Sequence, residues 1–116
     1  MKIILEPYYQ KVILKFVDNP TRYCKKKFKY DHSIEGLTVM DKGIIYMVFP
    51  KKPSMELISH EAFHAVHYCL AYKGVALDEH GEAYAYLLGK LIETIINKQN
   101  GIKQILWAYI RLHSSC

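Results

Sequence analysis

The chain has 116 residues and a mass of 13.6 kDa, enough for one domain with one core. Hydrophobic residues make up 51% and charged residues 23%, which excludes a disordered or low-complexity chain. No apolar run reaches the roughly 18 residues of a membrane span, and the N-terminal run Ile3–Leu5 is too short for a secretory signal. Three widely spaced cysteines, at positions 24, 69 and 116, predict free thiols. We therefore expect a cytoplasmic protein without membrane association.

The net charge of +5 is unevenly distributed. Residues 1–53 carry 11 Lys and Arg against 5 Asp and Glu, whereas residues 54–116 carry 5 against 6 and hold five of the six histidines. The first part is rich in strand-forming residues and includes a short basic segment, and the second part shows helical periodicity. The sequence predicts a single α+β domain over residues 1–116, with strands and a short basic helix in 1–53 and helices with a metal site in 54–116.

Strand and turn signals dominate the first half. Residues 11–17 predict a strand, although a 3.6-residue period also fits them. Asn19 or Thr21 can cap a short helix that carries the basic run Lys25–Lys29. Residues 36–40 and 44–49 flank Asp41-Lys42-Gly43 and predict a β-hairpin, with 44–49 as its outer strand and a free edge. The basic run accompanies no nucleic-acid-binding motif, so we interpret it as a solvated face, and nucleic acid is not expected as a partner.

Helix signals dominate the second half. Ser54 can cap a helix that runs to about Lys73, with Gly74 as the left-handed residue after it. Asp78 can cap the next helix, with Glu79 in its first turn and its end near Lys98. Asn100-Gly101 predicts a break, followed by a third helix with an apolar stripe. The stripe consists of Ile102, Ile105, Leu106, Tyr109 and Ile110.

Residues 60–64 read His-Glu-Ala-Phe-His, the HExxH pattern. Histidines at i and i+4 lie on one face of a helix, so both imidazoles can reach one zinc ion with bonds of about 2.0–2.1 Å. The glutamate between them, Glu61, can act as a general base that takes a proton from water activated by the ion. The pattern sits in an apolar-periodic helix, which is the context that this chemistry needs.

A catalytic zinc ion needs a third protein ligand and an open position. Seventeen residues separate His64 from Glu82, enough for a turn and an antiparallel return. Glu82 lies one turn inside the second helix, and Gly89, on the same face, would let the two helices approach closely. Asp78 and Glu79 compete with Glu82, but helix capping alone explains an acid at those positions. We favour Glu82 as the third ligand.

Further residues near this pattern are candidates for orienting the ligands or for donating to a developing oxyanion: His67, His80, Tyr84 and Tyr86. His67 shares a helix face with the other two histidines. Along a straight helix, however, it lies about 10.5 Å from His60 and cannot bind the same ion. An ordinary structural role fits His67 equally well.

The helical residues carry a resemblance. His-Glu-Ala-Phe-His followed by a Gly-Glu-Ala helix start resembles the gluzincin metallopeptidases, in which two His and a downstream Glu bind zinc. With the Gly-Leu-Thr hairpin, residues 36–92 resemble small zincin-like proteins of bacteriophages and prophages. The resemblance implies zinc on His60, His64 and Glu82, with Glu61 as base. Larger gluzincins often have an acidic residue four positions after the ligand Glu. In this sequence that position is occupied by Tyr86.

The expected fold is a minimal zincin-like α+β domain, in which a small twisted sheet of about three strands packs on the HExxH helix with two further helices behind. The expected function is a zinc-dependent metallohydrolase, foremost a peptidase that acts on a peptide or protein substrate. The alternative is a catalytically inactive zinc-binding phage protein that acts in the host cytoplasm by binding a host protein.

Overall fold

The computed structural model describes residues 1–76 and 81–113, with side chains to residue 100. Its centre is a four-stranded mixed sheet in the order β1-β2-β4-β3. β1 pairs antiparallel with β2, β2 pairs parallel with β4, and β3 pairs antiparallel with β4. The strands are β1 (Lys2–Leu5), β2 (Gln10–Val17), β3 (Leu37–Asp41) and β4 (Ile44–Pro50).

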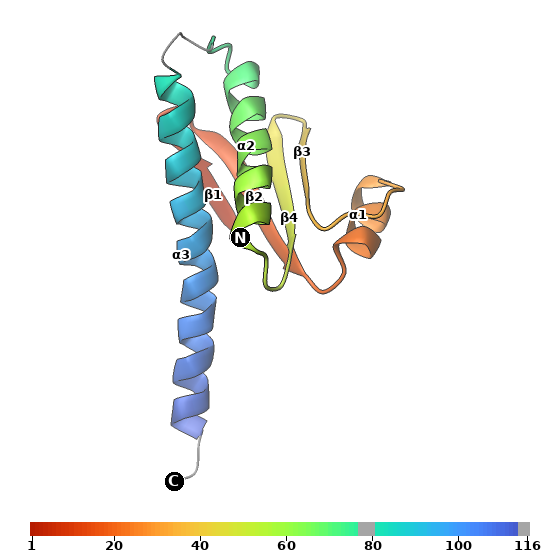
Figure 1. Ribbon diagram of the computed structural model, residues 1–116, viewed down its shortest axis with the longest axis vertical. Helices are drawn as coiled ribbons and strands as arrows, with labels where there is room; N and C mark the ends of the chain where they lie inside the picture. Colours follow the sequence, from red (N-terminus) through yellow and green to blue (C-terminus); the bar gives the residue numbers. More distant parts are fainter. Residues whose placement is uncertain (77–80, 114–116) are drawn as a thin grey trace.

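Two long helices lie side by side on one face of the sheet, and a short helix lies beyond the β3 end (Figure 1). The short helix is α1 (Pro20–Phe28), and the long ones are α2 (Met55–Tyr72) and α3 (Glu82–His113). α2 lies over β3 and β4, whereas α3 runs beside α2 and continues past the end of the sheet. In the part of the chain that the structure describes, no helix combines the length and apolar character of a membrane span.

The core lies between the sheet and the two long helices. Alternate residues of β2 point into it, and Val12 and Leu14 are fully buried opposite Ile45 and Met47 of β4. The helices contribute buried residues at helical spacing: Ile58, Ala62, Ala65, Val66 and Cys69 from α2, and Leu87, Leu91 and Ile95 from α3. Burying each large apolar side chain stabilises the fold by about 1.5–3 kcal/mol, so this packing fixes the rotation of α2 about its own axis.

Local signals in the sequence are confirmed. The Asn19 side chain caps α1 by accepting from the Arg22 N–H at 3.0 Å, and the Ser54 hydroxyl caps α2 by accepting from the Leu57 N–H at 3.1 Å. The turn between β3 and β4 has left-handed backbone at its last two residues, with φ of +52° and +78°. Gly74, after α2, also has a positive φ of +72°.

The strand count and the sheet edge differ from expectation. The sheet has four strands rather than three, because residues 2–5 pair with the first half of β2. The predicted edge strand 44–49 is wrong: β4 is an inner strand, bonded to β2 on one side and to β3 on the other. The parallel pairing of β2 with β4 is a long-range contact that no local pattern reveals. The free edge on the α2 side of the molecule therefore belongs to β3.

The predicted break at Asn100-Gly101 is also wrong, since α3 continues through both residues to His113. One glycine costs a helix interior only about 1 kcal/mol relative to alanine, and the apolar spacing continues on both sides of it. The expected cap Asp78 and first-turn Glu79 lie outside the described residues, and α3 begins at Glu82. Gly89 does not mediate close helix packing, because it is exposed and a Cβ there would meet no atom within 4 Å.

Two glycine substitutions are expected to change stability in opposite directions. Gly43→Ala should lower the free energy of unfolding by about 1–2 kcal/mol, since the residue has φ of +78° and a Cβ would lie 2.7 Å from Tyr72 Oη. Gly89→Ala should raise it by about 0.5–1 kcal/mol, because the site is helical and open. Urea denaturation of both variants measures the two changes. Destabilisation by Gly89→Ala would mean that the exposed face of α3 packs against something.

Candidate metal centre

His60 and His64 project from the solvent-facing side of α2 as a pair. Their Nε2 atoms lie 3.3 Å apart, and their ring centroids are 4.9 Å apart. The apolar face of α2 is committed to the sheet, so both rings are held on the outside, one helical turn apart. The pair thus presents two nitrogen lone pairs toward one point in front of the helix.

The spacing of these nitrogens fits a zinc ion. Two nitrogens that bind one tetrahedral zinc at about 2.0–2.1 Å lie about 3.3–3.4 Å apart. A direct hydrogen bond between the rings would instead need one nitrogen protonated and the other not. Zinc binding would need both Nε2 atoms unprotonated, and the distance between them fits the predicted cofactor.

Glu61 points from α2 toward the sheet and is only 6% exposed. Its Oε1 accepts a hydrogen bond of 2.8 Å from the hydroxyl of Thr38 on β3, and its Oε2 lies 3.9 Å from His60 Nε2. A buried carboxylate is costly unless it is hydrogen-bonded, so Thr38 stabilises its position. The carboxylate therefore lies beside the histidine pair without belonging to it.

Thr38 is a site residue that the sequence did not reveal. It lies on the inward face of β3 opposite Met47 of β4, and it is 5% exposed. Its hydroxyl also lies 3.2 Å from the main-chain oxygen of Glu61, so one side chain joins β3 to α2 at the site. The Gly-Leu-Thr start of the hairpin was visible in the sequence, but its pairing with Glu61 spans 23 residues.

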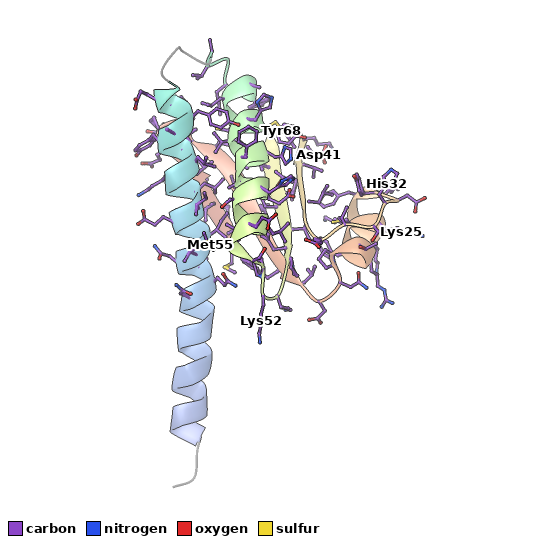
Figure 2. The ribbon with its side chains drawn as sticks, viewed as in Figure 1. Lys25, His32, Asp41, Lys52, Met55 and Tyr68 are labelled. Carbon is purple, nitrogen blue, oxygen red and sulfur yellow. The ribbon has the colours of Figure 1, made fainter. Side chains whose placement is uncertain are left out.

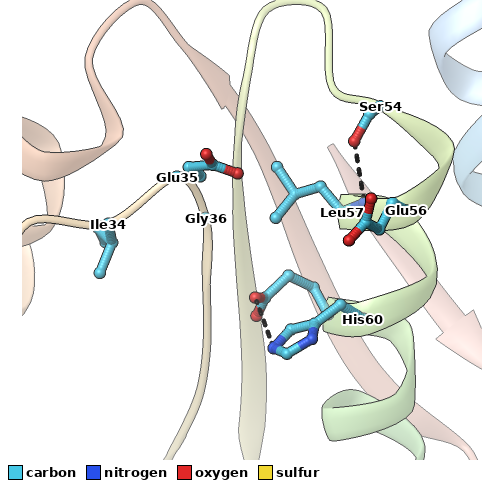
Figure 3. A pocket seen from close by; sticks show the side chains of 8 residues that line it. Ile34, Glu35, Gly36, Ser54, Glu56, Leu57 and His60 are labelled. Atoms are coloured by element: carbon cyan, nitrogen blue, oxygen red, sulfur yellow. Dashed lines mark hydrogen bonds and ion pairs between the residues drawn. The ribbon is translucent and has the colours of Figure 1, made fainter.

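A groove runs between α2 and the edge formed by β3 and the segment before it. It consists of two cavities of about 450 and 370 Å³ that share Ile34, Gly36, His60 and Glu61. Figure 3 shows the first cavity, with Glu35 on one wall, Glu56 on the other, and the His60–Glu61 contact at one end. Thr21 of α1 holds the far wall, since its hydroxyl donates to Ile34 O and accepts from Ile34 N–H. His60 and Glu61 thus lie where the two cavities of an open groove meet.

The two described cysteines take no part in this chemistry. Burial, and secondarily the Glu61 carboxylate, raise the pKa of the Cys24 thiol, and burial raises the pKa of Cys69. Both thiols are free, as expected, and both are held protonated and away from solvent. Cys116 lies outside the described residues.

Glu82 does not join the histidine pair. Two residues along a helix correspond to about 200° of rotation, and Tyr84 is the residue that faces α2, where its hydroxyl donates to Phe63 O at 3.1 Å. Glu82 therefore faces the other way, and it lines a separate cavity with Glu6, Tyr9 and Tyr86. Within residues 1–76 and 81–113, no group of three His, Cys, Asp or Glu is placed to hold a metal.

The remaining candidates are distributed as follows. His67 is exposed and lies edge-on to Tyr68, with ring centroids 6.5 Å apart, and it lines neither cavity of the groove. The hydroxyl of Tyr84 is engaged by Phe63, and burial raises its pKa. Tyr86 lies on the Glu82 side of α3. His80, like Asp78 and Glu79, lies outside the described residues.

The basic residues lie elsewhere on the surface. Figure 2 shows Lys25 on α1 and Lys52 before α2 extending away from the body of the protein. Lys25 lies 3.7 Å from Asp31, but both side chains are largely exposed, so this ion pair contributes little to stability. The basic run is a solvated face, as the sequence indicated.

Comparisons of the chain with protein-family models, with characterised proteins and with solved structures gave no match.

Thr38→Val is expected to lower the free energy of unfolding by about 1.5–3 kcal/mol, because it leaves the buried Glu61 carboxylate without its hydroxyl donor. Thr38→Ser keeps the hydroxyl and serves as the matched control, with a smaller loss expected from the missing methyl group. Denaturant titration of both variants at neutral pH measures the difference. Equal losses for Val and Ser would show that packing, rather than the hydrogen bond, is what Thr38 contributes.

Proposed function

We propose that the protein is a zinc-dependent metallohydrolase whose substrate is a peptide. The observation that carries this proposal is the geometry of the HExxH residues, with two Nε2 atoms 3.3 Å apart beside a buried, hydrogen-bonded carboxylate. A simple structural role for the histidines would require neither their convergence nor a carboxylate at that place. The position of these three residues in the middle of a groove supports access by a substrate.

Each residue has a distinct role in the proposed reaction. His60 and His64 would hold the metal as two of its ligands, and none of the described residues is placed beside them as the third. A bound zinc ion would supply Lewis acidity, polarising the scissile carbonyl and lowering the pKa of a water molecule to about 7. Glu61 takes the proton of the attacking water and delivers it to the leaving amine. Thr38 holds Oε1 of Glu61, which leaves Oε2 on the side of the histidines. Thr38 is in this sense a positioning residue.

The sheet edge supports a peptide as substrate. β3 is an edge strand, and its residues Leu37, Thr38 and Val39 line the groove together with the histidines. An extended peptide can add to such an edge by main-chain hydrogen bonds, which would place its backbone beside the metal centre. The sequence predicted a free edge at residues 44–49, whereas in the structure β3 is the edge strand to which a peptide would add.

Zinc binding is the first test. We expect the wild-type protein to bind about one zinc ion per chain, and His60→Ala and His64→Ala to lose it, since each removes one of two converging ligands. His67→Ala, an exposed histidine on the same helix, is the matched control and should retain zinc. Zinc at a hundredfold excess over Kd should stabilise the native protein by about 2.7 kcal/mol. Metal analysis and thermal unfolding with and without zinc measure both quantities.

The same measurements sort the acidic residues. Glu82→Ala should keep the zinc-induced stabilisation, because Glu82 faces away from α2 in this structure. Loss of the zinc-induced stabilisation in Glu82→Ala would make Glu82 the third ligand. Loss of that stabilisation in Glu79→Ala would assign Glu79 instead. A wild-type protein that takes up no zinc would overturn the metal centre itself.

Glu61→Gln separates the base from the ligands. Because Glu61 lies beside the histidine pair and has no part in metal binding, the variant should keep zinc and lose peptide hydrolysis by at least a hundredfold, about the lower limit for a general base. Hydrolysis of a mixed peptide library, followed by mass spectrometry, is the measurement. Loss of zinc from the variant would make Glu61 a ligand. Zinc binding without hydrolysis in the wild type would favour the inactive, partner-binding alternative.

A further inference from the structure

The groove has two arms of different chemistry on either side of the histidine pair. The arm toward the start of α2, about 450 Å³, adds Glu35, Ser54, Glu56 and Leu57 to the shared residues. The arm toward the end of α2, about 370 Å³, adds Tyr30, Leu37, Thr38, Val39, His64 and Tyr68. The first arm is therefore acidic with an aliphatic wall, and the second is aromatic and aliphatic.

The acidity of the first arm runs against the charge of the whole protein. The chain carries 16 Lys and Arg against 11 Asp and Glu, yet among the described residues no lysine or arginine lines either arm. The charged lining residues are Glu35, Glu56 and Glu61, with the histidines beside them. Since the low-dielectric walls of a cleft focus the field of like charges, this arm attracts cations.

Glu61 adds a buried carboxylate to the same field. It is 6% exposed, it lines both arms, and its Oε2 lies 3.9 Å from His60 Nε2, beyond hydrogen-bond distance. Because Oε1 is held by Thr38 and Oε2 lies beside His60, Glu61 contributes negative charge at the junction of the arms rather than a contact of its own. The negative charge of the arm thus comes from the buried Glu61 as well as from the exposed Glu35 and Glu56.

The shape of the first arm favours a long side chain. Leu57 extends from α2 toward Gly36, and Glu35 and Glu56 lie on opposite sides of it in Figure 3. A Cβ at Gly36 would come within 3.0 Å of Val48 O and 3.3 Å of Leu57 Cδ1, so glycine keeps this wall free of a further side chain. Leu57 and Ile34 give the arm an apolar lining beside its two carboxylates, which suits an aliphatic stem that ends in a cation.

We infer that this arm is a specificity subsite for a lysine or arginine side chain of the substrate peptide. The stem lies over Leu57 and Ile34, and the cationic head lies between Glu35 and Glu56. Tyr30, Leu37 and Tyr68 in the other arm then receive an apolar or aromatic residue on the far side of the scissile bond. The inference rests on the proposed function, since it places the scissile bond at the histidine pair.

Binding of short capped peptides tests the subsite. The probes are acetyl-Ala-Phe-Lys-Ala-amide and its order-reversed form acetyl-Ala-Lys-Phe-Ala-amide, each with the lysine also replaced by norleucine or by glutamate. NMR titration of the purified full-length protein gives the affinities, and mass spectrometry afterwards reports any cleavage. In at least one order, the lysine peptide should bind about two- to fivefold more tightly than the norleucine peptide, and the glutamate peptide should bind most weakly.

Variants of the two glutamates test whether they cause the preference for lysine. Glu35→Gln and Glu56→Gln should each reduce the ratio of lysine to norleucine affinity, and the double variant should bring it to about one. Both residues are exposed, so neither change should unfold the protein. Glu93→Gln, an exposed carboxylate of α3 outside the groove, is the matched control and should keep the wild-type ratio.

The outcomes distinguish this subsite from the metal centre. No lysine preference in either order, a preference that survives in the double variant, or no binding of any probe would overturn the subsite even if His60 and His64 bind zinc. A lysine preference that the double variant abolishes, in a protein that neither binds zinc nor cleaves the peptide, would leave the subsite standing and overturn the proposed function.

Discussion

The hydrogen bond between Thr38 and Glu61 joins the two elements that make the candidate site. Glu61 belongs to α2 and Thr38 to β3, and both are more than nine-tenths buried. A buried carboxylate without a donor would cost more than an ordinary hydrogen bond contributes, so the pair restricts how far α2 can move from the sheet edge. The groove keeps its width at the histidines because this contact lies at its floor.

The rotation of α2 follows from the core. Ile58, Ala62 and Ala65 must face the sheet, and this choice leaves positions 60 and 64 on the outside and position 61 at the boundary. The proposed function needs such a division, because the histidines would have to reach an ion in solvent while the glutamate stays in a partly dry wall. The spacing of the HExxH residues and the spacing of the buried residues both follow the same helical period. The position of one set around the helix therefore fixes the position of the other.

The sequence predicted the elements of this fold better than their arrangement. Caps at Asn19 and Ser54 and the left-handed Gly74 are local, and each depends on residues within one or two turns. The order of the strands depends on β2 pairing parallel to β4 across about thirty residues, and hydrophobic patterns alone do not choose between inner and edge positions. The break expected at Gly101 did not appear, because a continuous apolar stripe outweighs one weak helix former.

The same limit applies to the site. His60 and His64 are four residues apart, so the helical period alone predicts that they converge, and it places Glu61 about 100° from His60 around the helix. To predict where Glu82 lies, one must also know how α3 is rotated about its axis. That rotation is set by the contact of Tyr84 with Phe63 and by the burial of Leu87 and Leu91. Glu82 lies five positions before Leu87 and nine before Leu91, about 140° and 180° around the helix, so once both leucines face inward Glu82 lies on the side of Tyr86 and Glu6. Long-range partners such as Thr38, and the acids that line the groove from both walls, carry no signature in spacing. They are recognised only when the sheet brings segments far apart in the chain to the same place.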